Sequence, residues 1–298
     1  TGWSWVAAFF AIILWGATPA ATQIAVTAID ATIVGVLRTI LASLILLPVA
    51  FMMRLPRPND KASWEALSVS AFAGFVGYTL LFTIGLKYTS TTHAALILAA
   101  SPVFTGLIGF AVDRKWPRWL WWLGASIALA GEFLLISYRT SAAGKDTASF
   151  EGDLMVLCAA VLASAGYVSG GRLSSKIGAW AATTWAIIMA GLIQIPILAL
   201  PRNLAQITIT NSNISSWLSL IYLVVFTSII GYAAWYWAIG KAGVARISPI
   251  QFTQPIISLV IAAILFNEPF TYPVVIAVVT ILSGVLITRI SHTANTHQ

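Results

Sequence analysis

Apolar residues occupy this chain in ten long blocks, which short polar connections separate. The blocks cover residues 3–26, 32–53, 64–86, 90–112, 118–138, 152–171, 179–200, 215–239, 244–266 and 270–289. Each block is close to the roughly 20 residues that a helix needs to cross the hydrocarbon core of a bilayer. The pattern predicts an all-α integral membrane protein with ten transmembrane helices.

Two stretches of the chain, Gly77 to Leu107 and Gly231 to Val260, share one pattern. Each begins with Gly-Tyr, runs through aromatic and aliphatic residues to a second glycine, and passes a lysine before reaching a proline. The offset is 154 residues between the two Gly-Tyr pairs and 153 residues between Pro102 and Pro255. A match at a nearly constant offset indicates internal duplication.

The duplication divides the ten predicted helices into two sets of five. We expect a first five-helix repeat at residues 1–138, a linker at 139–151, a second repeat at 152–290 and a C-terminal tail at 291–298. Because five is an odd number, the second repeat enters the membrane from the opposite side. Inverted repeats are typical of secondary transporters, which alternate access to a central site.

Composition excludes a water-soluble protein. Apolar residues make up 59% of the chain and charged residues only 8%, whereas soluble domains carry about 25% charged residues. The net charge of +7 does not indicate a nucleic-acid partner, because the basic residues are scattered singly between apolar blocks. The single cysteine, Cys158, excludes an intramolecular disulfide.

Lysine and arginine are distributed unevenly over the predicted loops. Loops on one side of the membrane carry eleven of the sixteen basic residues and those on the other side carry four, while Arg38 lies within the second block. Cytoplasmic loops carry the excess of basic residues. The distribution predicts a multi-pass protein of a bacterial inner (plasma) membrane, with both termini in the cytoplasm.

Five segments together carry a resemblance to a known family. They are IILWGATPAATQIAV (12–26), LRTILASLILLP (37–48), LKYTSTTHAALILAASPVFTGLIGFAV (86–112), AWYWAIGKAGVARISPIQFTQPIISLVIAAILFNEPFT (234–271) and ILSGVLI (281–287). In this combination the chain resembles the EamA-type exporters of the drug/metabolite transporter superfamily over nearly its whole length. The resemblance implies a ten-helix bundle whose central cavity is lined mainly by spans 1, 3, 4, 6, 8 and 9.

Several aromatic residues fall on the spans that the resemblance assigns to the cavity. They are Trp15, Tyr78, Phe82, Tyr167, Tyr232, Trp235 and Trp237. Tyr78 and Phe82 share a helix face, and Tyr232 takes the place of Tyr78 in the second copy. Aromatic walls with a few hydroxyl groups suit an apolar or aromatic amino acid. Ordinary packing or lipid contact is the alternative for about half of the set, Trp235 and Trp237 especially.

Pro102 and Pro255 interrupt the fourth and ninth blocks at equivalent positions. Because proline removes a backbone donor, each helix is expected to kink or loosen there. Interrupted helices at corresponding positions indicate a binding site or a hinge. Polar candidates beside these sites are Ser101, Gln254, Thr18, Gln23 and Gln251, for which ordinary interhelical hydrogen bonding is the alternative. Small residues are expected to allow close helix approach, namely Gly16, Gly74, Gly77, Gly106 and Gly109.

Arg38 and Glu132 are the charges that lie clearly within apolar blocks. Charges inside a membrane are costly and indicate function by default. We weigh three interpretations: a structural ion pair between the two, an arginine that attracts a substrate carboxylate, and side chains that extend to the membrane interface. His93, at the start of the fourth block, is expected to be an ordinary surface histidine.

Motifs for catalysis are absent from the sequence. It contains no HExxH, GxSxG or GxxxxGK[ST] motif and no paired carboxylates within a block. We therefore expect neither catalytic residues nor metal ligands nor a cofactor. The predicted function is alternating-access export of amino acids, hydrophobic and aromatic ones included, or of related small metabolites. The alternatives are a multidrug or organic-cation carrier, a nucleotide or sugar carrier and a membrane enzyme. The expected partners are a small-molecule substrate and membrane lipid, and the expected state is a monomer.

Overall fold

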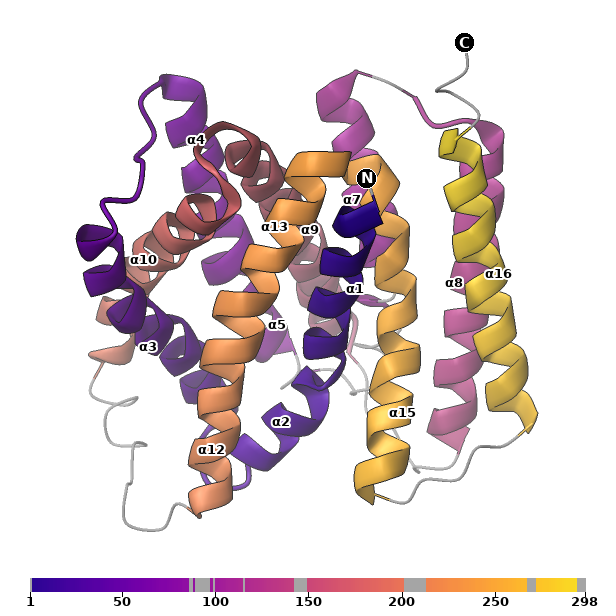
Figure 1. Cartoon of the computed structure of the whole chain (residues 1–298). Helices are drawn as coiled ribbons and strands as arrows, with labels where there is room; N and C mark the ends of the chain where they lie inside the picture. Colours follow the sequence, from indigo (N-terminus) through magenta and orange to yellow (C-terminus); the bar gives the residue numbers. More distant parts are fainter. Residues whose placement is uncertain are drawn as a thin grey trace.

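The computed structural model describes residues 2–85, 88, 97–98, 100–114, 116–141, 149–200, 213–266 and 272–293. Within these residues all regular secondary structure is helical (Figure 1). The first half contains α1 (Gly2–Gly16), α2 (Thr18–Ala25), α3 (Ala31–Met52), α4 (Lys61–Val69), the π-helical η1 (Ser70–Gly77), α5 (Tyr78–Gly85), α7 (Ser101–Asp113) and α8 (Trp119–Ser141). The helices therefore follow the predicted apolar blocks.

The second half has the same order of spans, although its first span, α9, is unbroken. It contains α9 (Phe150–Ile177), α10 (Ala179–Leu198), α12 (Ile214–Tyr222), the π-helical η3 (Leu223–Gly231), α13 (Tyr232–Ala242), α14 (Val244–Ile247), the 3-10 helix η4 (Ser248–Thr253), α15 (Gln254–Phe266) and α16 (Tyr272–Thr293). Across the described residues, six continuous helical stretches are long and apolar enough to cross a membrane, and three further apolar helices are shorter. This is a multi-pass membrane protein.

The packing of the helices obeys the predicted duplication. Helix α3 packs against α10, and α8 packs against α16, so each of these pairs joins equivalent helices of the two halves. Helix α1 packs against α13 and α15, while α9 packs against α5, η1 and α7. Exchanging the halves converts the second set of contacts into the first. The architecture is two inverted five-helix repeats that interlock, as the sequence predicts.

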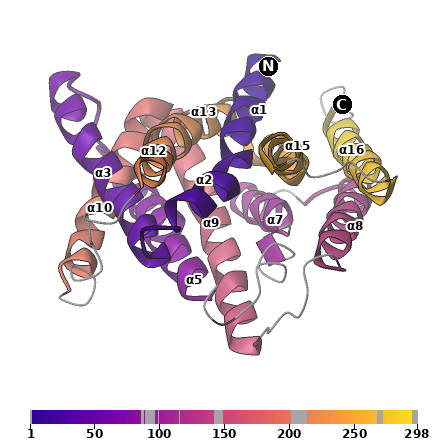
Figure 2. The same ribbon diagram turned by 90° about the horizontal axis from the view of Figure 1, so that it is seen from below.

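The start of α1 and the end of α16 lie at the same end of the bundle, as expected for an even number of spans (Figure 1). Seen from below, the α8–α16 pair stands at one edge, and α9 crosses the middle between α5 and α7 (Figure 2). Helix α9 therefore occupies the middle of the bundle, in contact with α5 and α7.

Helix breaks occur close to prolines, and two further irregular segments occur where the sequence places no proline. Pro102 and Pro255 lie in the first turns of α7 and α15, the second of which follows the 3-10 segment η4. The interruption predicted for these positions is confirmed. The first span is also broken, at Ala17 between α1 and α2. The π-helical segments η1 and η3 occupy equivalent places, each directly before one of the Gly-Tyr tyrosines.

Small residues bring the helices together, as predicted. A Cβ atom added to Gly74 of η1 would lie 3.1 Å from Cα of Gly166 in α9, and one added to Gly106 would lie 2.4 Å from the Trp121 ring. The α8–α16 pair is equally close, because a Cβ on Gly284 would lie 2.5 Å from the carbonyl oxygen of Gly124. These contacts fix the helices at short interaxial distances.

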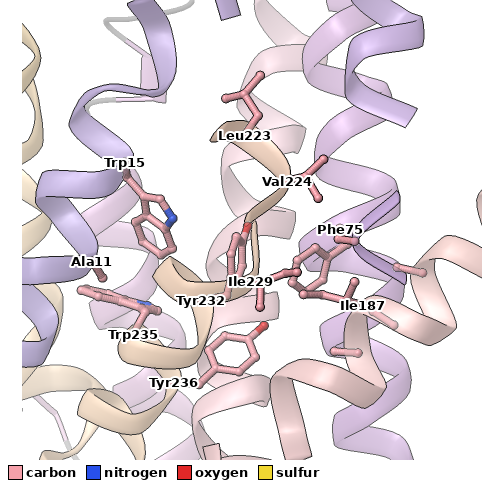
Figure 3. Packing of buried hydrophobic residues seen from close by; sticks show 14 of the residues in the cluster. Ala11, Trp15, Phe75, Ile187, Leu223, Val224, Ile229, Tyr232, Trp235 and Tyr236 are labelled. Atoms are coloured by element: carbon pink, nitrogen blue, oxygen red, sulfur yellow. The ribbon is translucent and has the colours of Figure 1, made fainter. Parts of the chain in front are cut away.

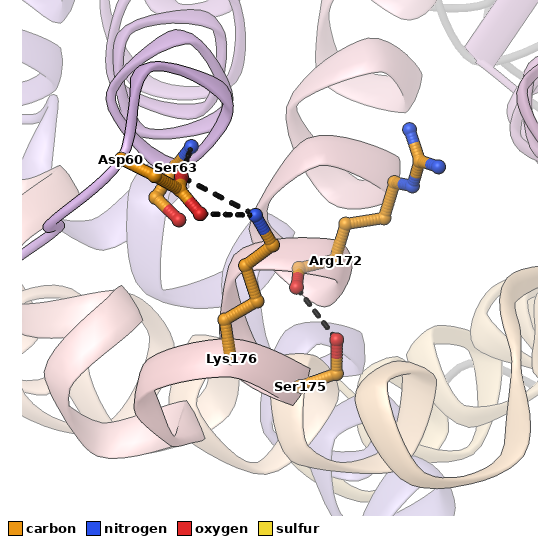
Figure 4. A network of polar contacts seen from close by, with 5 residues as sticks. All are labelled: Asp60, Ser63, Arg172, Ser175 and Lys176. Carbon is orange, nitrogen blue, oxygen red and sulfur yellow. Dashed lines mark hydrogen bonds and ion pairs between the residues drawn. The ribbon is translucent and has the colours of Figure 1, made fainter.

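One exposed ion pair ties the two repeats at the end of the bundle where α4 begins (Figure 4). Asp60 caps α4 by accepting from the Ser63 backbone N–H at 2.6 Å, and it also pairs with Lys176 Nζ at 2.9 Å. Lys176 lies in the last turn of α9. The carboxylate therefore joins the third span to the sixth.

Candidate functional site

Three aromatic rings of the second repeat surround Trp15 of the first. Its ring centroid lies 5.1 Å from that of Tyr232, 5.4 Å from that of Trp235 and 5.5 Å from that of Tyr167. Figure 3 shows the indole of Trp15 directed at the α13 residues Tyr232 and Trp235. We call Trp15, Tyr167, Tyr232 and Trp235 the aromatic cluster. It joins spans one, six and eight.

Helix interruptions position the aromatic cluster. Trp15 lies at the end of α1, directly before the break at Ala17, and Tyr232 is the first residue of α13 after η3. A Cβ atom on Gly231 would lie 2.7 Å from Trp15 Nε1, so a glycine is needed for the indole to approach. In the pair Gly231-Tyr232, the glycine therefore allows the Trp15 indole to come close, and the tyrosine supplies the ring that it contacts.

The cluster is mostly buried, and one member remains accessible. Trp15, Tyr232 and Trp235 are 6%, 4% and 0% exposed, whereas Tyr167 is partly exposed. Of the two alternatives for Trp235, ordinary packing or lipid contact, lipid contact is wrong, because its ring packs on Trp15 and Tyr167 inside the bundle. Its indole Nε1 has no hydrogen-bond partner among the described residues. Trp237 is partly exposed and lies outside the cluster.

Arg38 is held by the second repeat. Its Nε donates to Ser228 Oγ at 3.1 Å, and its Nη2 donates to Thr227 Oγ1 at 3.3 Å. The Thr227 carbonyl oxygen accepts from Trp15 Nε1 at 3.0 Å. A single turn of η3 therefore fixes both the guanidinium and the central indole.

Glu132 lies in different surroundings. It is 1% exposed and lies on α8, whose main packing partner is α16, and its Oε2 has no hydrogen-bond partner among the described residues. No ion pair joins it to Arg38 in the described part of the chain. The hypothesis of a structural pair between these two charges is therefore wrong. The interpretation of Arg38 as extending to the interface is also wrong, because its side chain bonds to buried hydroxyl groups.

The sites of the two prolines are stabilised by equivalent hydroxyl groups. Thr105 Oγ1 of α7 donates to Ser164 Oγ of α9 at 3.1 Å, and Ser164 Oγ approaches the Ser101 carbonyl oxygen at 3.2 Å. In the other repeat, Ser258 Oγ of α15 donates to the Gly16 carbonyl oxygen at 2.8 Å. Thr105 and Ser258 differ by the repeat offset of 153 residues. These contacts join spans four and six and spans nine and one.

The remaining candidates lie on the expected helices but not within the aromatic cluster. Tyr78 stacks on Phe82 with a centroid distance of 5.6 Å. Pro102 is buried, and Ser101, Gln254 and Pro255 are partly exposed at the starts of their helices. Thr18 Oγ1 and Gln251 Oε1 are buried and have no hydrogen-bond partner within the described residues. His93 and the side chain of Gln23 lie outside the described residues.

Residues that sequence reasoning missed supply much of the site's framework. Thr227 and Ser228 hold Arg38, Phe75 packs on Tyr232 at 4.4 Å, and Tyr236 OH lies 2.7 Å from Ser70 Oγ. The signal for the first two was an adjacent Thr-Ser pair inside an otherwise apolar block. Nothing in the local sequence singles out Tyr236. No group of histidine, cysteine and acidic residues suited to a metal ion occurs within the described residues.

The fold and its relatives define the class of the protein. Two inverted five-helix repeats that place side chains of both halves around a central region are the architecture of a secondary membrane transporter. The sequence profile of the EamA-like transporter family matches residues 2–137 and 150–290. The chain belongs to this family.

Relatives cover nearly the whole chain. An uncharacterized transporter of Bacillus subtilis (strain 168), YdeK, is 24% identical over 287 residues, which are 96% of each chain. An uncharacterized transporter of Archaeoglobus fulgidus is 25% identical over 291 residues, again 96% of each. A solved structure titled "Crystal structure of protein" superposes with a TM-score of 0.80 at 18% identity and covers 96% of both chains. That likeness supports the fold alone.

Proposed function

We propose that this protein exports amino acids with apolar or aromatic side chains, or closely related metabolites, by alternating access. The observation that carries the proposal is the aromatic cluster, which combines Trp15 of the first repeat with Tyr167, Tyr232 and Trp235 of the second. In an inverted-repeat transporter, the solute binds where the repeats meet. The proposed site is the partly exposed side of this cluster, at Tyr167.

The chemistry of the cluster supports an amphipathic solute. Aromatic faces bind apolar and aromatic groups, and the hydroxyl group of the partly exposed Tyr167 supplies a directional donor. A sugar or a nucleotide would require many more polar groups than these residues carry. The inference favours amino acids over those two alternatives within the same family.

The membrane and the direction of transport follow from the charge distribution. The excess of basic residues on one set of loops supports cytoplasmic termini in a bacterial inner membrane. Export is proposed on the resemblance to EamA-type exporters, and we infer that a single chain suffices because both repeats are present.

Reconstitution tests the proposal directly. The purified protein is placed in liposomes loaded with single radiolabelled amino acids, and efflux is followed with protein-free liposomes as the control. We expect saturable efflux of tryptophan, phenylalanine or leucine, and none of glutamate or lysine above the control. Absence of saturable flux for every amino acid would refute the proposed function.

A further inference from the structure

We propose that Arg38, held in place by Thr227 and Ser228, forms a receptor for the carboxylate group of the transported solute. The proposal deepens the function proposed above and rests on it. It names the substrate class: carboxylates that carry an apolar or aromatic group, zwitterionic amino acids included. It also argues against the alternative that the protein carries organic cations.

The guanidinium lies deep in the membrane. Thr227, to which it donates, is 13 residues from the start of the 29-residue span Ile214–Ala242. At 1.5 Å per residue this is about 20 Å from the end of that helix, close to the middle of the bilayer. Thr227 and Ser228 are 0% and 2% exposed, so the side chain points into the bundle. A cation at this depth is costly unless a counter-charge compensates it.

The described part of the chain supplies no such counter-charge. Arg38 forms no ion pair with an acidic side chain among the described residues, and its two hydrogen bonds there go to neutral hydroxyl groups. Arg38 itself is only partly buried, so a solute can reach it. A permanently charged group with neutral neighbours and access to a solute is suited to an anion.

The geometry leaves the right part of the guanidinium available. Arginine carries five N–H donors, in a planar arrangement that matches a carboxylate. Its Nε and Nη2 are used by Ser228 and Thr227, so the Nη1 end makes no hydrogen bond with any described residue. These two hydrogen bonds fix the plane of the guanidinium group and leave its Nη1 end free for a carboxylate. Thr227 and Ser228 act as positioning residues in this account.

The aromatic cluster lies beside this receptor. Tyr232 packs on Trp15 through its ring, at 5.1 Å between centroids. Thr227 binds Arg38 through its hydroxyl group and Trp15 through its carbonyl oxygen. A solute that joins a carboxylate to an aromatic side chain by one or two carbon atoms matches this arrangement.

The receptor exists in one repeat only. Pro48 of α3 and Pro196 of α10 lie inside equivalent helices at an offset of 148 residues. At this offset Arg38 corresponds to Ala186, which is 0% exposed and carries no charge. At the offset of 154 residues between the Gly-Tyr pairs, Thr227 and Ser228 correspond to Ala73 and Gly74. The inverted repeats therefore provide one carboxylate site per chain, so one carboxylate is bound in each cycle.

A matched pair of solutes separates the receptor from the rest of the site. L-tryptophan and L-tryptophanamide have the same shape, and only the first carries a carboxylate. Both compete against radiolabelled L-tryptophan efflux from liposomes containing the wild-type protein. Loss of a charged hydrogen bond costs about 1.5–3 kcal/mol, which corresponds to a roughly tenfold to hundredfold weaker competition by the amide. Indole-3-propionate, which lacks the ammonium group, is expected to compete within about threefold of tryptophan.

Variants assign the discrimination to Arg38. Arg38→Gln is expected to reduce the preference for acid over amide to less than about threefold, because the charge is lost. Arg38→Lys keeps the charge but not the planar group and gives an intermediate preference. Arg172→Gln, which removes an exposed arginine of α9, is the matched control and keeps the full preference. Size-exclusion profiles verify the folding of each variant. If Arg38→Gln fails to fold, the variants Ser228→Ala and Thr227→Val are measured in its place. We expect these variants to have a severalfold higher KM for tryptophan and unchanged competition by the amide.

The outcomes are distinguishable. No saturable tryptophan efflux from wild-type liposomes refutes the proposed function itself. Efflux with equal competition by acid and amide, or with competition by tryptamine that exceeds that of indole-3-propionate, overturns the carboxylate receptor and leaves the transporter standing. A folded Arg38→Gln variant that retains the full preference for the acid also overturns it.

Discussion

The indole N–H of Trp15 donates to the backbone carbonyl oxygen of Thr227 at 3.0 Å, across 212 residues of sequence. This bond joins the end of α1 in the first repeat to the π-helical segment η3 in the second. Because Thr227 also holds Arg38, the bond links the aromatic and the charged parts of the proposed site. Movement of η3 relative to α1 would therefore alter both parts together.

Replacing Trp15 by phenylalanine tests this bond. The variant Trp15→Phe keeps an aromatic ring but loses the donor, at an expected cost of about 0.5–2 kcal/mol for a hydrogen bond within a membrane protein. We expect a lower melting temperature in detergent and a higher KM for the transported amino acid. Trp119→Phe is the control, because Trp119 is 69% exposed. Equal losses in both variants would show that the bond is unimportant.

Gly166 is expected to tolerate no side chain. A Cβ atom there would lie 2.3 Å from Cα of Gly74, a backbone atom that cannot move aside cheaply. Overpacking of this kind costs about 1–3 kcal/mol or more. Gly166→Ala should lower the melting temperature markedly, whereas Gly2→Ala, with no atom within 4 Å of the added Cβ, should not. A Gly166→Ala protein as stable as wild type would contradict the close approach of η1 and α9.

Much of the fold follows from the sequence, because a bilayer demands long apolar helices. The apolar blocks and the Gly-Tyr repeat predicted the spans and their inversion. The break in the first span was not predicted, although Pro19, just after Ala17, is a visible signal. The π-helical segments carry no signal in their composition, since SAFAGFVG and LVVFTSIIG read as ordinary apolar helix.

The site was less predictable than the fold for a physical reason. Spacing along one helix reveals which residues share a face, and it correctly joined Tyr78 to Phe82. It does not reveal which helices touch. The contacts of Arg38 with Thr227 and Ser228 span 189 and 190 residues of sequence. Because nothing in the local sequence indicates such distant partners, the sequence offers Glu132, the other charge within an apolar block, as the partner of Arg38. Only the interlocking of the repeats brings those hydroxyl groups to the arginine.

Tyr236 and Ser70 are expected to be energetically coupled. Their oxygen atoms lie 2.7 Å apart in a buried position, and they join α13 to the first residue of η1. In a double-mutant cycle of Tyr236→Phe and Ser70→Ala, we expect a coupling of about 0.6–1.7 kcal/mol in the free energy of unfolding. Equilibrium unfolding in denaturant, measured for wild type, both single variants and the double variant, gives this coupling free energy. Additive effects of the two substitutions would mean that the contact contributes nothing.

Asp60 gives the protein a weak acid sensitivity. Hydrogen bonds from Ser63 and the ammonium group of Lys176 lower the pKa of this carboxyl group from 3.8 to about 2. Because the pKa is lower in the folded state, the stabilisation is present above about pH 4 and is lost as the pH falls towards 2. The group is exposed, so the effect is small and is reduced by salt.

Melting temperatures measured from pH 5 down to pH 2 test this effect. Asp60→Asn keeps a capping residue but removes the charge, so it should melt below wild type at pH 5 and converge with it near pH 2. Glu65→Gln, another exposed carboxylate on the same helix, is the control. A constant difference between wild type and Asp60→Asn over this range would argue against the ion pair.

The central claim is that the solute binds at the aromatic cluster, and protection of a cysteine at Tyr167 tests it most directly. Tyr167 is the partly exposed member of the cluster, and Cys158, nine residues earlier on the same helix, is exposed. Alkylation is measured in Tyr167→Cys on a Cys158→Ser background, and in wild type for Cys158 alone. We predict that tryptophan slows alkylation at position 167 saturably, with a midpoint near the KM for transport, and leaves Cys158 unaffected. A variant that still transports tryptophan, yet shows no protection at position 167, would contradict the account.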